Sequence, residues 1–253
     1  MELKVLLKRI DEVKNIIGKR KPLSEEEFSQ VMDYYRAEFT YSTNAMEGNT
    51  LSFRETKAIL DGESKLEDKP ISECYDVIRH GVACDFIFSL AKQEDLNITE
   101  DIIMSLHRLL YQNIDDENAG KYKDQKDTLG GENGALPNTK TSRLVSHLIR
   151  VMDSRKKDAH PIVLAAYAHR KIIEIQPFEE GNGRVARLLM NLILLNNGYQ
   201  VASIPPSIEA NYISSMKIEE KTTESSNKPF TDIIADCEYE SLKYYCRRFN
   251  IEI

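Results

Sequence analysis

Residues 176–187 read Gln176-Pro-Phe-Glu-Glu-Gly-Asn-Gly-Arg-Val-Ala-Arg187, and leucine and isoleucine at helical spacing follow directly. The glycines of residues 181–183 therefore stand at the start of a predicted helix, where backbone N–H groups and the helix dipole attract an anion. Arg184 and Arg187 are three positions apart, so both guanidinium groups are expected on one side of the first turn, in reach of phosphate oxygens. The stretch predicts a polyphosphate-binding loop that opens an apolar helix.

Glu180 stands immediately before the glycines. Mg²⁺ needs only one or two protein carboxylates when phosphate oxygens and water complete its octahedron. Glu180 is therefore a candidate magnesium ligand beside the phosphates. The alternative is a glycine-rich helix start with two surface arginines and no ligand, and a bare Gly-x-Gly pattern would favour that alternative.

Composition sets the fold around this stretch. The chain has 253 residues, of which 41% are hydrophobic and 30% charged, so it is expected to be a globular protein with a sizeable core. It contains only 11 glycines and 8 prolines, which leaves few turns and favours long helices over many short strands. We expect an all-α fold and one domain over residues 1–253.

Apolar residues recur at helical spacing over most of the chain. The predicted helices cover residues 3–19, 24–48, 52–62, 70–92, 100–112, 141–153, 161–175, 183–197, 207–217 and 229–249. Ser24 with Glu27, and Ser52 with Glu55, are capping boxes that mark two of the helix starts. The exception is residues 118–138, which hold four glycines and predict an exposed β-hairpin near residues 124–136.

Several classes of protein are excluded. The net charge is −7 and the isoelectric point about 5.4, which argues against nonspecific nucleic-acid binding. The longest charge-free run, Leu188 to Ile208, is broken by asparagine, glycine and proline, so it does not predict a membrane span. The four cysteines form no Cys-x-x-Cys pair, and no export signal opens the chain, so we expect reduced thiols and a cytoplasmic location.

The wider string resembles the signature of the Fic family, His-Pro-Phe-x-(Asp/Glu)-Gly-Asn-Gly-Arg-x-x-Arg. Eight of its nine specified positions match, namely Pro177, Phe178, Glu180, Gly181, Asn182, Gly183, Arg184 and Arg187. The resemblance extends over about residues 25–220. It implies a Fic-type helical bundle with a short β-hairpin flap, in which residues 1–60 supply N-terminal helices, about 70–220 the core, and 229–253 a C-terminal helix.

The resemblance also implies a reaction, the transfer of AMP from ATP with Mg²⁺ to a Ser, Thr or Tyr hydroxyl of a target protein or of this chain itself. In that scheme Glu180 holds the metal, and residues 181–183 bind the α- and β-phosphates. Asn182 and Arg184 support those contacts, and Arg187 meets the γ-phosphate. The glycine-rich residues 120–134 take the place of the flap that aligns the target chain.

One position departs from the family pattern. The first residue of the signature is a histidine that takes the proton from the attacking hydroxyl, and this chain has Gln176 there. A carboxamide accepts a hydrogen bond but does not carry a proton away near neutral pH, so we expect weak or absent activity. His169 lies seven residues upstream, about 10.5 Å along a helix, too far to act as the base. A natural glutamine and an introduced one are both compatible with the sequence.

A second pattern lies in residues 43–48. Thr43 to Gly48 fits the (Ser/Thr)-x-x-x-Glu-(Gly/Asn) pattern of the Fic inhibitory helix. Thr43 and Glu47 are four apart and share a helix face. We expect Glu47 to form an ion pair with Arg187. Because Arg187 is the residue expected to bind the γ-phosphate, this ion pair would compete with that contact.

Three functions are compatible with these patterns. The first is an autoinhibited protein adenylyltransferase that Gln176 weakens or inactivates. The second is a catalytically silent ATP-binding protein with a regulatory or interaction role. The third is an enzyme of altered chemistry that removes AMP, with Glu47 positioning a water, although it too would lack a proton carrier. No segment of the sequence indicates the target protein or the oligomeric state.

Overall fold

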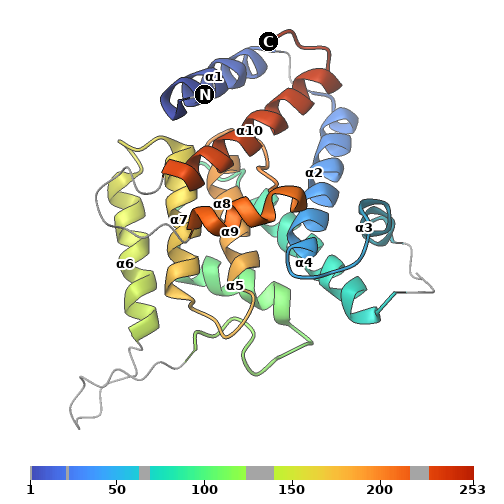
Figure 1. Cartoon of the computed structure of the whole chain (residues 1–253), viewed down its shortest axis with the longest axis vertical. Helices are drawn as coiled ribbons and strands as arrows, with labels where there is room; N and C mark the ends of the chain where they lie inside the picture. The colour runs from blue at the N-terminus through green and yellow to red at the C-terminus, as the bar shows by residue number, and fades with distance from the viewer. Residues whose placement is uncertain (1, 21–22, 63–68, 124–139, 217–227) are drawn as a thin grey trace.

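The computed structural model describes residues 2–20, 23–62, 69–123, 140–216 and 228–253, and these residues form helices joined by short connections (Figure 1). The helices are α1 (Leu3–Gly18), α2 (Glu25–Ala45), α3 (Phe53–Leu60), α4 (Ile71–Leu90), α5 (Glu100–Tyr111), α6 (Lys140–Arg155), α7 (Pro161–Ile175), α8 (Asn182–Asn196), the 3₁₀ turn η1 (Pro206–Ile208), α9 (Glu209–Met216) and α10 (Lys228–Arg248). No strand occurs in the described ranges, so the all-α prediction is confirmed there.

The predicted hairpin near residues 124–136 lies outside the described residues. The chain that leads to it is described as far as Lys123, whose backbone N–H donates to the carbonyl of Pro177 over 2.9 Å. The segment predicted to carry the flap therefore begins beside residues 176–187.

Two helices begin where their capping boxes predict. The Ser24 side chain accepts from the backbone N–H of Glu27, and the Glu27 carboxylate accepts from the backbone N–H of Ser24. Ser52 and Glu55 exchange the same two bonds at the start of α3. Because each box satisfies two N–H groups that lack an intrahelical partner, it fixes the helix start locally.

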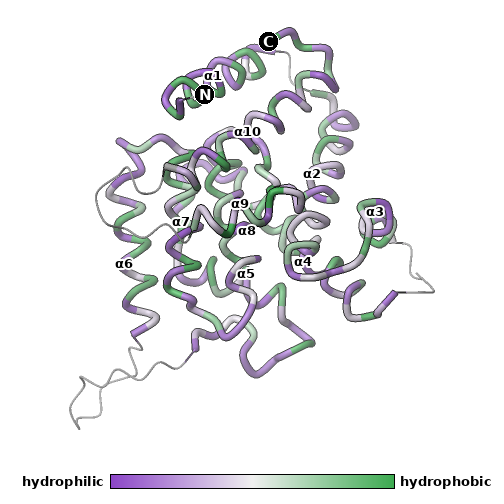
Figure 2. The backbone as a smooth tube through the Cα atoms, in the orientation of Figure 1, coloured by the Kyte–Doolittle hydropathy of each residue, from purple (hydrophilic) through white to green (hydrophobic). Residues whose placement is uncertain are grey.

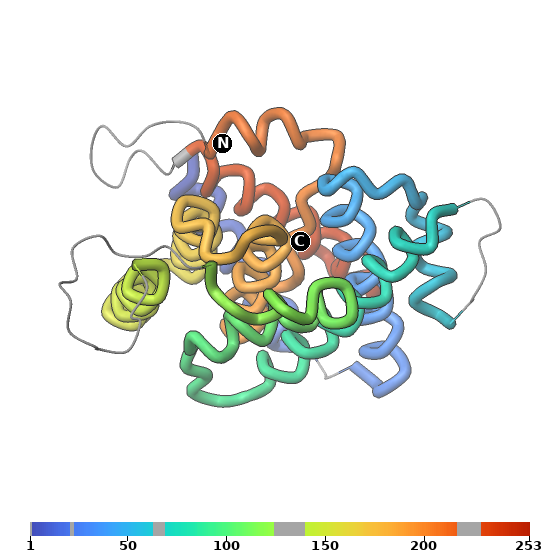
Figure 3. Tube along the Cα trace, turned by 90° about the horizontal axis from the view of Figure 1, so that it is seen from below, coloured from blue at the N-terminus to red at the C-terminus, as the bar shows by residue number. Residues whose placement is uncertain are grey.

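Helix α8 lies at the centre of the molecule. It packs most extensively on α7 and also contacts α4, α5 and α2. In Figure 3, α8 lies between α6 and α3, which stand at opposite edges. Val185, Leu188, Leu189 and Leu192 are fully buried, which explains why this helix is apolar on nearly every face. The N-terminus of α8, where the sequence predicts anion binding, is thus anchored in the core.

The peripheral helices are amphipathic. Figure 2 shows hydrophobic and hydrophilic colours alternating along α1 and α6, as expected of helices that bury one face. Helix α1 packs on α10 through a buried face that includes Leu6, Ile10 and Val13.

Two further predictions concern cysteines and membranes. All four cysteines are free thiols, as the sequence predicts, and three of them are buried. Within the described ranges, every helix is too short or too polar to cross a bilayer.

Candidate nucleotide-binding site

The loop between α7 and α8 is held in shape by one asparagine. The Asn182 side chain is 5% exposed and bonds to both backbone groups of Phe178, accepting from the N–H over 2.9 Å and donating to the carbonyl over 2.8 Å. Its amide nitrogen also donates to Gln176 Oε1 over 3.2 Å. Asn182 therefore braces the loop that the sequence assigns to phosphate binding.

At two positions of this loop only glycine fits, because a side chain from another element lies where a Cβ atom would stand. Gly181 has φ +72°, and a Cβ atom there would lie 2.4 Å from Cε2 of Tyr111. A Cβ atom on Gly183 would lie 2.9 Å from Oε1 of Glu47. Gly181 is also the N-cap of α8 and has no side chain to cap the first turn, so the N–H groups there remain suited to an anion.

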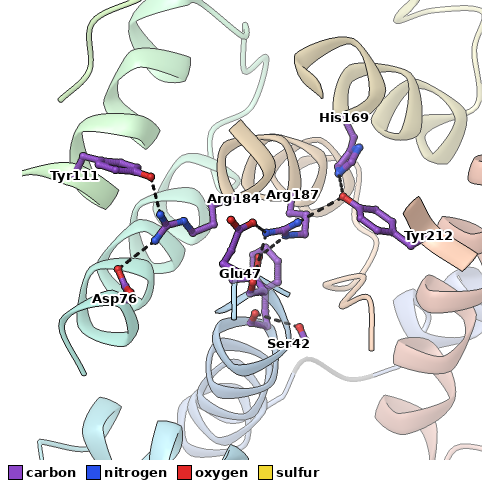
Figure 4. Close-up of polar contacts among 10 residues, drawn as sticks. Ser42, Glu47, Asp76, Tyr111, His169, Arg184, Arg187 and Tyr212 are labelled. Atoms are coloured by element: carbon purple, nitrogen blue, oxygen red, sulfur yellow. Dashed lines mark hydrogen bonds and ion pairs between the residues drawn. The ribbon is translucent and has the colours of Figure 1, made fainter. Parts of the chain in front are cut away.

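Arg187 is buried, and contacts surround its guanidinium group (Figure 4). Its Nη2 donates to Glu47 Oε1 over 2.6 Å and to the Thr43 carbonyl over 3.4 Å, while its Nε donates to Thr43 Oγ1. On the opposite side, its Nη1 donates to the Tyr212 hydroxyl over 3.5 Å. The predicted ion pair between Glu47 and Arg187 is therefore present.

The environment of Arg187 keeps it charged. Burial alone would disfavour the charge, but the Tyr212 hydroxyl and the Glu47 carboxylate outweigh it and raise the pKa of Arg187. Tyr212 is in turn 3.0 Å from Nε2 of His169. Full burial, and then the charge of Arg187, hold the pKa of His169 well below its usual value.

Arg184 begins on the same helical turn but reaches different neighbours (Figure 4). Its Nη1 lies 3.2 Å from Asp76 Oδ1 on α4, and its Nη2 donates to the Tyr111 hydroxyl on α5 over 2.8 Å. The two arginines expected on one side of the helix thus separate, one toward α4 and α5, the other toward α2 and α9.

Comparison with known proteins agrees with this geometry. Residues 97–194 match the model of the Fic/DOC family. The chain is 32% identical over 206 residues to "Protein adenylyltransferase Fic" of Drosophila persimilis, and 32% identical over 208 residues to "Protein adenylyltransferase fic-1" of Caenorhabditis briggsae. This chain contains a Fic/DOC domain.

Solved structures place the whole fold in the same group. Fic-1 (aa134–508) from C. elegans superimposes with a TM-score of 0.82 at 27% identity, covering 96% of this chain and 71% of that one. A Fic domain containing signaling protein from Bacteroides thetaiotaomicron gives 0.81 at 26% identity, covering 98% and 99%. The two curated relatives are matched over 81% and 82% of this chain but only 40% of their own length, so the chain spans about two fifths of those proteins.

Glu180 of this Fic domain is exposed and lines an open cleft of about 780 Å³ together with Asp76, Tyr111 and Arg184. Within the described residues, no group of three or more His, Cys, Asp or Glu side chains is arranged to hold a metal. A carboxylate that faces an open cleft suits Mg²⁺ that takes its other ligands from phosphates and water. The position of Glu180 is compatible with the predicted metal site.

Gln176 ends α7 in a left-handed conformation, with φ 49° and ψ 60°. Its Nε2 donates to the carbonyl of Ile173 over 2.8 Å, and its Oε1 accepts from Asn182. Both ends of the amide are therefore engaged by the protein, although the residue is exposed. His169 does not substitute for it as a base, because its ring contacts Tyr212 and Phe230 inside the core.

Sequence reasoning missed three residues of the site. Asp76 and Tyr111 contact Arg184 from positions 108 and 73 residues away, and Tyr212 contacts Arg187 from 25 residues away. None of them stands in a short pattern with its partner, so their roles emerge only from the packing of α4, α5 and α9 around α8.

Proposed function

We propose that this Fic domain transfers AMP from ATP to a hydroxyl group of a protein, and that Glu47 holds it in an inhibited state. The observation that carries the proposal is the Glu47 carboxylate, 2.6 Å from Arg187 Nη2 and close above Gly183. The relatives named protein adenylyltransferase support the reaction class. The target, a protein with a Ser, Thr or Tyr hydroxyl, and a cytoplasmic location both stay predictions.

Each residue of the site has a separate role in the proposed reaction. The uncapped start of α8, with Gly181 and Gly183, binds the phosphates, and Glu180 would hold Mg²⁺, which neutralises charge on the phosphate oxygens. The hydroxyl oxygen of the target bonds to the α-phosphorus, and the bond from that phosphorus to the bridging oxygen breaks. Pyrophosphate leaves, and the hydroxyl proton passes to water, because Gln176 supplies no base. The protein supplies orientation and electrostatics for this step.

Glu47 would inhibit the step by competing for one cation. A γ-phosphate bound to Arg187 would have to approach a carboxylate that already holds the same guanidinium group. Two anions at that distance repel each other, and the repulsion is strong because Arg187 is only 4% exposed at its side chain. ATP entering with Glu47 in place would therefore adopt a pose unsuited to transfer.

Gln176 adds a separate obstacle, because its amide does not remove the proton from the attacking hydroxyl. The test is labelling of protein with radiolabelled ATP and Mg²⁺ by two variants. We expect Gln176→His combined with Glu47→Gly to label at least ~10²-fold faster than Glu47→Gly alone, the lower end of the effect of a general base. Arg187→Ala in the double variant is the control and should abolish the gain.

Two outcomes would change this account. If Glu47→Gly labels as fast as the double variant, Gln176 is no handicap. If the double variant binds ATP but labels nothing in a broad lysate, itself included, a catalytically silent ATP-binding protein becomes the better function. The engagement of both ends of the Gln176 amide by Ile173 and Asn182 favours that second candidate.

A further inference from the structure

The two arginines of the site differ in how many of their N–H groups are occupied. All three nitrogens of Arg187 donate to Thr43, Glu47 or Tyr212. Arg184 makes one contact from each terminal nitrogen, whereas a guanidinium group has two N–H bonds on each of these nitrogens. Arg184 is thus held in place and still has one N–H group on each terminal nitrogen to offer, while four of the five N–H groups of Arg187 are engaged.

The contacts of Arg184 fix the plane of its guanidinium group. Asp76 holds Nη1 from α4, and the Tyr111 hydroxyl holds Nη2 from α5. The guanidinium carbon also lies 5.1 Å from the centre of the Tyr111 ring. Two hydrogen-bond partners and one ring face leave this side chain little rotational freedom.

Tyr111 is itself held rigidly. Its ring stacks on His107 at 4.6 Å, and His107 lies parallel to Phe178 at 3.9 Å. The backbone N–H of Gly120 donates to Nδ1 of His107 over 2.9 Å. The ring stack therefore connects Arg184 to Phe178, which belongs to the same loop as Glu180.

We propose that Asp76 and Tyr111 are positioning residues, which hold Arg184 so that its remaining N–H groups are available to a phosphate group in the cleft that Glu180 also lines. The inference rests on the proposed function, because its ligand is the phosphate chain of a nucleotide with its divalent cation. Asp76 and Tyr111 together engage only two N–H groups of Arg184, whereas Glu47, Thr43 and Tyr212 together engage four of Arg187. A pre-oriented guanidinium group loses less freedom when phosphate binds, so affinity increases.

Two effects of Asp76 oppose each other, and variants separate them. Its contact orients Arg184, whereas its negative charge repels phosphate. Asp76→Asn keeps the Oδ1 acceptor and removes the charge, while Asp76→Ala removes both. If positioning dominates, only the alanine variant weakens phosphate binding. If repulsion dominates, both variants strengthen it.

The experiment measures binding to a parent chain with Glu47→Gly, in which Arg187 has lost its carboxylate partner. Calorimetry gives the affinity for ATP with Mg²⁺, and ligand-observed NMR gives that for adenosine. We expect Asp76→Ala and Tyr111→Phe each to weaken ATP binding about tenfold, the effect of one charge-assisted hydrogen bond. The affinity for adenosine should not change. The affinity of Asp76→Asn for ATP should stay within about threefold of that of the parent or exceed it.

Asp85→Asn is the matched control. Asp85 lies on the same helix as Asp76 and pairs with Arg36 at 2.9 Å, away from the residues that line the cleft. It should leave ATP affinity unchanged. Circular dichroism of every variant checks that the helices are retained, and Tyr111→Phe keeps the ring that fills the space beside Gly181.

The outcomes distinguish the inference from the function on which it rests. If the parent binds no ATP, the proposed function fails and the inference with it. If the parent binds ATP and Asp76→Ala binds it equally or more tightly, the proposed function survives and Asp76 is not a positioning residue. If the variants lose as much affinity for adenosine as for ATP, Asp76 and Tyr111 only maintain the fold, and the inference is wrong.

Discussion

Gly181 connects the backbone conformation of the loop between α7 and α8 to the position of Arg184. Its φ of +72° is a left-handed conformation, and Tyr111 fills the space where a side chain would stand. Tyr111 in turn contacts Arg184. The requirement for glycine at this position thus has two independent causes, a backbone angle and the close approach of an aromatic ring that orients an arginine.

Substitution of this glycine separates the two causes. We expect Gly181→Ala to lower the free energy of unfolding by ~2–5 kcal/mol, from the left-handed strain and from overpacking against Tyr111. Gly48→Ala is the matched control, because Gly48 has φ +89° and no atom within 4 Å of the added Cβ. It should cost only the strain, ~1–2 kcal/mol. Urea unfolding measures both, and equal losses would contradict the role given to Tyr111.

Glu47 can be tested by its effect on stability as well as on transfer. Glu47→Gly removes the carboxylate beside a buried guanidinium group, and we expect a loss of ~1–2 kcal/mol, reduced from a fully buried pair because Glu47 is 36% exposed. ATP with Mg²⁺ should restore stability by ~2.7 kcal/mol at a hundredfold excess over its dissociation constant. Thermal unfolding with and without nucleotide measures both changes.

Glu47→Gln provides the comparison, since it keeps a hydrogen-bond acceptor without the charge. Its melting temperature should lie between those of the unchanged chain and Glu47→Gly. The unchanged chain should gain less from ATP than either variant. A nucleotide-induced gain that is the same in all three chains would show that Glu47 does not compete with the phosphates.

At the scale of elements, short sequence patterns predicted the features that depend only on residues close together in the chain. The capping boxes at Ser24 and Ser52 fixed two helix starts because their bonds span only three residues. The ion pair of Glu47 with Arg187, 140 residues apart, was predicted only through resemblance to a family. Asp76 escaped prediction, because helical periodicity does not say which partner helix a polar residue will face.

At the scale of the whole molecule, buried groups that titrate make the stability of the fold depend on pH. His80, His107 and His169 are buried, and burial lowers the pKa of each, that of His107 to about 4. In the unfolded chain these groups return to a pKa of about 6.5, so below that pH the unfolded state binds more protons. The free energy of unfolding therefore falls as the pH falls from about 6.5 toward 4.

Buried Glu238 acts in the opposite sense. Burial raises its pKa well above the usual value, so the folded chain keeps a proton that the unfolded chain releases above about pH 4.5. Its contribution to stability therefore grows as the pH falls. His160, with a lowered pKa, and Glu38, with a raised one, shift in opposite senses and partly offset each other. Three histidines with a lowered pKa outnumber one glutamate with a raised pKa, so the free energy of unfolding falls as the pH falls below about 6.5.

Urea unfolding at pH 7, 6 and 5.5 measures this balance. We expect the chain to be less stable at pH 5.5 than at pH 7 by roughly 1–2 kcal/mol. Glu238→Gln removes the opposing titration and should steepen the loss. Because His107 lies on α5 and His169 on α7, one cooperative transition whose slope involves both would support the prediction that residues 1–253 form one domain. Stability that is flat or rising between pH 7 and 5.5 would mean that the buried histidines bind protons in the folded chain as readily as in the unfolded chain, which would contradict their lowered pKa.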